Sequence, residues 1–147
     1  MDTNDIILIV LATIGLSIIA LYIFSTKYRR IAAVSARIFI GLVFVYSGFV
    51  KSVDPLGFQY KMTDYLTAFG MEWFIPTTLF MAVLLNLAEF LIGFVLVFGV
   101  RVKLFSWGAL LFMIFFTPLT LYLAIKNPVH DCGCFGDAWI LTNWQTF

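Results

Sequence analysis

The chain has 147 residues, of which 63% are hydrophobic and 12% are charged, and its formal net charge is +1. Soluble domains are typically about 45–50% apolar and about 25% charged, so this composition excludes an ordinary soluble protein and indicates a membrane protein. The sequence has no basic run of the kind that binds nucleic acid. Its two cysteines allow at most one disulfide within the chain.

Four segments are long and apolar enough to cross a bilayer, which takes about 20 residues in a helix. They are residues 6–24, 31–50, 75–100 and 104–125. The second contains one charged residue, Arg37, and the third contains one, Glu89. Because lipid offers no partner to backbone amides, we expect all four segments to be helical. The predicted fold class is therefore an all-α integral membrane protein whose four transmembrane helices form a bundle.

The positive charges predict how these helices cross the membrane. Five cations lie in the first and third connections: Lys27, Arg29, Arg30, Arg101 and Lys103. Cationic connections stay on the cytoplasmic side, so the N-terminus, residues 51–74 and the C-terminal tail are expected on the outer face. In a bacterial inner membrane this face is the periplasmic one. The charge order around the first span, acidic before and basic after, favours an anchor over a cleaved signal peptide.

The segments outside the spans carry their own local signals. Asp54-Pro55 should end the second helix, because the residue before a proline disfavours helical dihedrals. Within residues 58–74 we expect a short amphipathic helix on the membrane surface. Thr142 and Gln145 have the spacing of a capping box and predict the start of a helix. This tail, residues 138–147, is either an interfacial stub or the start of a further span of a longer protein, and we favour the second.

Residues 130–137 read HDCGCFGD and hold both cysteines and the only histidine of the sequence. One glycine separates Cys132 from Cys134, and a disulfide between them requires a bent backbone, which glycine permits. Strained, exposed disulfides tend to be labile or catalytic, and disulfides persist outside the cytoplasm. An imidazolium beside a thiol also increases the fraction of the reactive thiolate. Cys132, Cys134 and His130 are therefore the candidate catalytic residues of a thiol–disulfide exchange.

Two other interpretations of this stretch stay open. The cysteines could be inert thiols that pack in a glycine-rich turn. They could also bind zinc or copper together with His130 and Asp137. Because zinc sites usually space their cysteines as C-x₂₋₄-C, the C-x-C spacing is a poorer match, and we predict no metal site.

Polar residues inside the predicted spans form the second candidate site. A carboxylate in mid-span, such as Glu89, usually faces the bundle and has a partner. Asn86 lies on the same helix face, and Arg37 is the predicted partner of Glu89. In the alternative, Arg37 extends to the cytoplasmic interface and Glu89 is neutral. In the functional interpretation, Glu89, Asn86 and Arg37 contact a quinone cofactor, although no residue pattern specifies quinone.

Three stretches together resemble the DoxX-like superfamily and, within it, the MauE family of methylamine utilisation proteins. They are ARIFIGLVFVYSGFVKSVDPLGF, NLAEFLIGFVLVFGV and HDCGCFGD, and the resemblance spans residues 36–137. The Cys-x-Cys-Phe-Gly turn at Cys132 points to MauE specifically. The matching residues of the two helical stretches are Arg37, Ser47, Gly48, Lys51, Asp54, Pro55, Glu89 and Gly93.

The resemblance implies a four-helix membrane bundle that takes part in disulfide formation. MauE-type proteins are implicated in forming the disulfides of the methylamine dehydrogenase small subunit, and they are compared with quinone-linked disulfide carriers. Two features depart from the family pattern: residues 6–24 form an additional N-terminal helix, and the fourth core helix expected after the cysteine turn is missing from the chain. Many relatives have no methylamine pathway, so the resemblance does not imply that substrate for this chain.

The sequence thus predicts three parts: residues 1–30 with the first span and cytoplasmic connection, residues 31–137 as the core, and residues 138–147 as the tail. The predicted function is a periplasm-facing thiol–disulfide relay whose partners are the bilayer and a periplasmic or membrane protein. Two alternatives belong to other classes. One is a structural or assembly subunit of a larger membrane complex, and the other is a metal-handling membrane protein.

Overall fold

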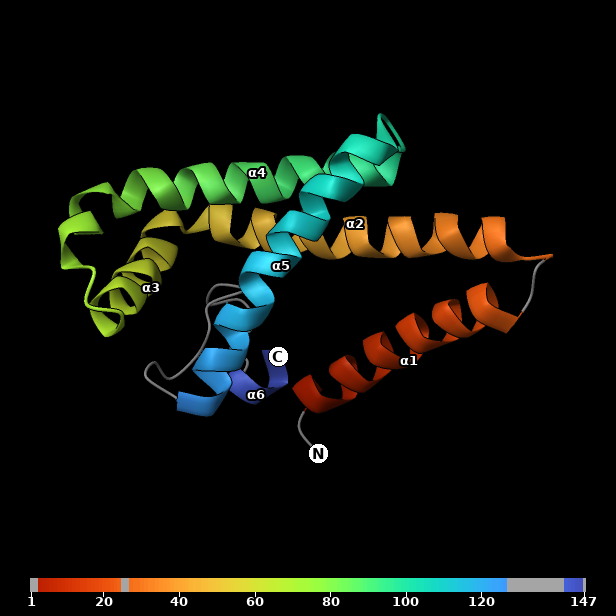
Figure 1. Ribbon diagram of the computed structural model, residues 1–147, viewed down its shortest axis with the longest axis horizontal. Coiled ribbons are helices and arrows are strands. Elements are labelled where there is room, and N and C mark those ends of the chain that lie inside the picture. Colours follow the sequence, from red (N-terminus) through yellow and green to blue (C-terminus); the bar gives the residue numbers. More distant parts are fainter. Residues whose placement is uncertain (1–2, 25–26, 127–141, 147) are drawn as a thin grey trace.

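A computed structural model describes residues 3–24, 27–126 and 142–146, and every regular element in these ranges is helical (Figure 1). The elements are α1 (Thr3–Phe24), α2 (Arg29–Val53), α3 (Pro55–Ala68), the 3₁₀ helix η1 (Glu72–Thr77), α4 (Thr78–Phe98), α5 (Val102–Lys126) and α6 (Asn143–Thr146). Four stretches have the length and composition of membrane spans: Asp5–Ile23, Arg29–Val53, Glu72–Phe98 and Val102–Lys126. The predicted all-α membrane fold with four spans is confirmed.

The antiparallel pair of α2 and α4 is the centre of the molecule and its most extensive helix contact. Small residues recur along the facing stripes and let the two backbones approach closely. A Cβ atom on Gly93 would lie 2.6 Å from the backbone nitrogen of Val45, and one on Gly48 would lie 2.8 Å from that of Phe90. These contacts fix the register: the C-terminal end of α2 lies beside the middle of α4.

The other helices pack around this pair (Figure 1). α5 crosses it obliquely, and an edge-to-face contact joins Phe44 of α2 to Phe112 of α5, with 5.6 Å between ring centroids. α1 contacts α2 near their connection and then runs obliquely away from it, whereas α3 folds back against α4. The ring of Phe69, which caps α3, also lies 5.1 Å from that of Tyr122 in α5. The N-terminal end of α1 lies near α6 and the C-terminal end of α5.

The helix boundaries follow local chemistry. α2 ends at Val53, and Asp54 caps α3 by accepting a hydrogen bond from the Gly57 N–H at 2.9 Å, with Pro55 in the first turn. A helix was expected within residues 58–74 and is found as α3 at Pro55–Ala68, and its location on the membrane surface stays a prediction. Pro76 lies in η1, the 3₁₀ turn that leads into α4. Gly99 ends α4 with φ +76°, a left-handed conformation that glycine adopts without strain.

Candidate functional site

The predicted catalytic residues Cys132, Cys134 and His130 lie in residues 127–141, outside the described part of the chain. The same holds for Asp137, the fourth residue of the alternative metal-ligand set. The structure describes the elements on both sides of this segment, since α5 ends at Lys126 and α6 begins at Asn143. Among the described residues, no group of three or more His, Cys, Asp or Glu side chains could hold a metal ion.

Two sets of hydrogen bonds hold α6 in place. The predicted capping box is confirmed: the Thr142 N–H donates to Gln145 Oε1 at 3.0 Å, and the Gln145 N–H donates to Thr142 Oγ1 at 3.3 Å. Gln145 Nε2 also donates to Asp5 Oδ1 at 2.7 Å, which ties α6 to the N-terminal turn of α1. α6 packs against α5 as well, beside its C-terminal end (Figure 1). The C-terminal end of α5 and α6 therefore lie at the same end of the molecule.

A buried ion pair lies inside the bundle, between α2 and α4. Lys51 Nζ lies 2.6 Å from Glu89 Oε2, and both side chains are almost completely enclosed by protein. The Lys51 ammonium also lies 5.1 Å from the centroid of the Phe58 ring, a cation–π distance. α3 contributes Phe58, so three helices enclose the pair. Neighbouring opposite charges reduce the high cost of placing either charge in a low-dielectric interior.

Asn86 completes this cluster through a backbone contact. Its Nδ2 donates a hydrogen bond of 3.1 Å to the carbonyl oxygen of Lys51. In an uninterrupted helix this carbonyl would accept from the residue four positions later, but that residue is Pro55, which has no N–H. Asn86 thus satisfies a carbonyl that the helix break leaves without a donor. We call Lys51, Asn86 and Glu89 the polar cluster.

The predicted contact between Arg37 and Glu89 is wrong, because the partner of Glu89 is Lys51. The antiparallel register explains the difference, since it places Arg37 at the opposite end of α4, beside Gly99. A Cβ atom on Gly99 would lie 2.8 Å from Arg37 Nη1. The guanidinium thus lies at the C-terminal end of α4, where the helix dipole favours a cation. Its Nε is buried without a hydrogen-bond partner among the described residues.

The structure therefore brings together two of the three residues predicted to contact quinone, Asn86 and Glu89, and separates Arg37 from them. The structure also brings Lys51 into this cluster, although the residue lies just beyond the predicted second span, residues 31–50. A signal for Lys51 was available, because it continues the buried α2 stripe of Gly41, Phe44 and Gly48 by one further step of three residues. In the same way, Glu89 and Asn86 precede Gly93 on the facing stripe of α4.

The burial of the polar cluster limits what it can bind. Asn86 is 2% exposed, Lys51 is 4% exposed and Glu89 is 6% exposed. A quinone ring does not reach these side chains unless the surrounding helices move, so the cluster does not fit a quinone headgroup in this arrangement. We derive no electron-transfer step through it. The geometry instead suits a structural role, in which the polar cluster holds α2, α3 and α4 together.

Comparison with known proteins places the chain in a family. The family model described as Methylamine utilisation protein MauE matches residues 29–147. The chain belongs to the MauE family. The match confirms the family expected from the sequence, and the wider DoxX-like relationship stays a prediction. No curated protein and no solved structure matches the chain.

The extent of the match separates α1 from the rest of this MauE-family protein. The match starts at the first residue of α2 and includes the polar cluster, the cysteine stretch and α6. α1 lies outside it, in agreement with the additional N-terminal helix expected from the sequence. The family features are thus found in the part of the chain from α2 onward, and the hydrogen bond from Gln145 to Asp5 joins α1 to that part.

Proposed function

We propose that this multi-pass membrane protein of the methylamine utilisation type is a thiol–disulfide relay whose reactive pair is Cys132 and Cys134. One observation carries the proposal: all the cysteines of the chain and its one histidine lie within eight residues of the segment between α5 and α6. Membership of the MauE family supports it. The anchoring of the flanking helices supports it too, because a reactive turn acts reproducibly only if both its ends are held.

The proposed reaction is a two-step exchange that starts from the disulfide form. A thiolate of a partner protein attacks one sulfur of the Cys132–Cys134 disulfide, so a mixed disulfide forms and the other cysteine leaves as a thiolate. The second thiolate of the partner attacks the mixed disulfide, which leaves the partner oxidised and the pair reduced. Reoxidation transfers two electrons and two protons to an acceptor, for which the family resemblance suggests a membrane quinone.

We further propose that the reactive turn faces the periplasm from an inner membrane. The connection between α1 and α2 carries Lys27, and that between α4 and α5 carries Arg101. The antiparallel register places both connections at the same end of the α2–α4 pair, as the neighbouring Arg37 and Gly99 illustrate. Five cations therefore gather at this end, which the positive-inside rule assigns to the cytoplasm. α6 and the N-terminus would then be periplasmic.

The proposal predicts a trapped intermediate in cells. We expect one of the single variants Cys132→Ser and Cys134→Ser to accumulate a mixed disulfide with a partner protein. In that variant the remaining thiolate attacks the disulfide of the oxidised partner and displaces one partner thiolate, and no neighbouring cysteine is present to resolve the adduct. The measurement is non-reducing electrophoresis after acid quenching and thiol alkylation, followed by identification of the partner by mass spectrometry. The adduct should disappear on reduction.

A double variant, Cys132→Ser with Cys134→Ser, is the matched control and should form no adduct. Full function in the double variant would contradict the relay and would favour a structural or assembly subunit. Stoichiometric metal in the purified protein, lost in His130→Ala, would instead favour the metal-handling alternative.

A further inference from the structure

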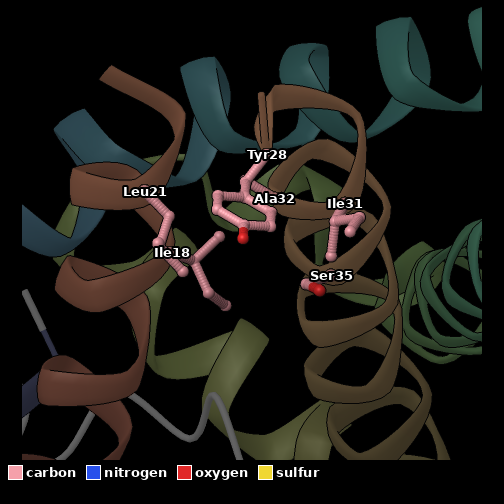
Figure 2. Close-up of a pocket in the computed structure, with 6 residues that line it drawn as sticks. All are labelled: Ile18, Leu21, Tyr28, Ile31, Ala32 and Ser35. Carbon is pink, nitrogen blue, oxygen red and sulfur yellow. The ribbon is translucent and has the colours of Figure 1, made fainter. Parts of the chain in front are cut away.

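A groove between α1 and α2 lies at the cationic end of the molecule. It has a volume of about 370 Å³, within the range of small-molecule sites, and is lined by Ile18, Leu21, Tyr28, Ile31, Ala32 and Ser35. Figure 2 shows Ile18 and Leu21 entering from α1, opposite Ile31 and Ser35 of α2, with the Tyr28 ring between the two helices. The wall is almost entirely apolar, which suits a hydrocarbon chain.

Three exposed cations, Lys27, Arg29 and Arg30, are next in sequence to the groove residues Tyr28 and Ile31. Aromatic rings hold two of them close to the groove. The Arg29 guanidinium lies 4.8 Å from the Tyr22 ring centroid, and Lys27 Nζ lies 5.8 Å from that of Tyr28, which lines the groove. The sequence has no carboxylate side chain between Asp5 and Asp54, so neither α1 beyond its first turn nor α2 offers these cations a counter-charge.

The spacing of the two features matches the layout of a phospholipid. Ser35 lies six residues from Arg29 along α2, which is about 9 Å at 1.5 Å per residue. If the cations lie at the level of the headgroups, the groove therefore starts beside that level at Tyr28 and extends about 9 Å into the acyl region. Basic sites between transmembrane helices on the cytoplasmic side are known to hold anionic lipid headgroups.

We propose that the groove between α1 and α2 binds an anionic phospholipid, with one acyl chain against Ile18, Leu21 and Ile31 and the phosphate against Lys27, Arg29 and Arg30. The apolar wall accounts for the acyl chain, and the three cations, which have no acidic neighbour on α1 beyond its first turn or on α2, account for the anionic headgroup. The bound lipid fills the space between α1, which lies outside the family match, and α2, where the match begins.

Native mass spectrometry of the full chain in detergent tests this proposal. Palmitoyl-oleoyl phosphatidylglycerol is titrated against phosphatidylcholine with the same acyl chains, and the lipid-bound fractions are compared. We expect preferential retention of one phosphatidylglycerol. Arg29→Gln with Arg30→Gln should weaken its binding roughly 30-fold, the effect expected for two cations near an anionic surface. Ser35→Phe, which places a ring in the groove, should reduce retention of both lipids several-fold.

Arg101→Gln with Lys103→Gln is the matched control, because it removes two exposed cations from the other connection at the same end. This variant should retain phosphatidylglycerol like the parent protein. Both double variants should keep the parent's thermal unfolding temperature in detergent without added lipid, which shows that they fold. Equal retention of the two lipids would overturn the proposal. So would an equal loss in both double variants, or a dimer that forms through α1 and excludes lipid.

Discussion

Replacing Glu89 with glutamine is expected to destabilise the protein by about 3–5 kcal/mol, because the Lys51 ammonium then stays in the bundle interior without its counter-charge. Glutamine keeps the shape of the side chain, so little of this loss comes from packing. The measurement is unfolding in detergent by heat or by added dodecyl sulfate. Glu72→Gln makes the same chemical change at an exposed position that precedes α4, and it should change stability by less than about 0.5 kcal/mol.

The double variant Lys51→Met with Glu89→Leu should recover most of the stability lost in Glu89→Gln. Buried ion pairs can often be replaced by apolar residues of similar volume at little or no cost, whereas removal of one partner is costly. A double variant as unstable as Glu89→Gln would contradict this account of the pair. If the double variant is stable but its Cys132 and Cys134 are no longer reoxidised, Lys51 and Glu89 have a role in electron or proton transfer in addition to holding the helices together.

Gly93→Ala is expected to cost about 1–3 kcal/mol, because α2 and α4 must separate to admit the methyl group. Its Cβ atom would lie 2.6 Å from the Val45 nitrogen and 2.7 Å from the Gly41 oxygen, and these backbone atoms are not free to rotate away. Gly48→Ala should behave in the same way, since its Cβ would meet the backbone of Phe90 at 2.8 Å. The same unfolding measurement in detergent applies to both variants.

Two glycines outside this contact provide matched controls. Among the residues that the structure describes, a Cβ atom on Gly15 in α1 meets nothing within 4 Å, and one on Gly108 in α5 meets only the Ile92 side chain, with Cδ1 at an ordinary 3.6 Å. Alanine at either position should be neutral, or stabilising by up to about 1 kcal/mol, because alanine is the better helix former. If Gly93→Ala were as mild as Gly15→Ala, the close contact between α2 and α4 would be contradicted.

Features set by nearby residues could be predicted from the sequence. The four spans follow from long apolar runs, and the end of α2 follows from Asp54-Pro55, whose effect on the backbone is local. The capping box of Thr142 and Gln145 spans only three residues and was predicted correctly.

Pairings between distant residues could not be predicted in the same way. Lys51 and Glu89 are 38 positions apart, and their contact depends on the register of α2 against α4, which composition does not fix. The prediction paired Glu89 with Arg37 because Arg37 was the one cation within a predicted span. It assigned Lys51 to the outer-face segment 51–74 and missed that this residue is buried in the bundle, where α3 covers it. Asn86 donates to the Lys51 carbonyl in place of the N–H that Pro55 lacks, and this role also depends on the register of α2 against α4.

The redox state of Cys132 and Cys134 is the most direct test of the proposed thiol–disulfide relay. Thiols are trapped by acid quenching and alkylation in intact cells, and the purified protein is then equilibrated against a glutathione series. The relay predicts a disulfide that forms in cells and is reversibly reduced at a potential well above about −300 mV. Cysteines that stay reduced and inaccessible to alkylation in the folded protein would contradict it.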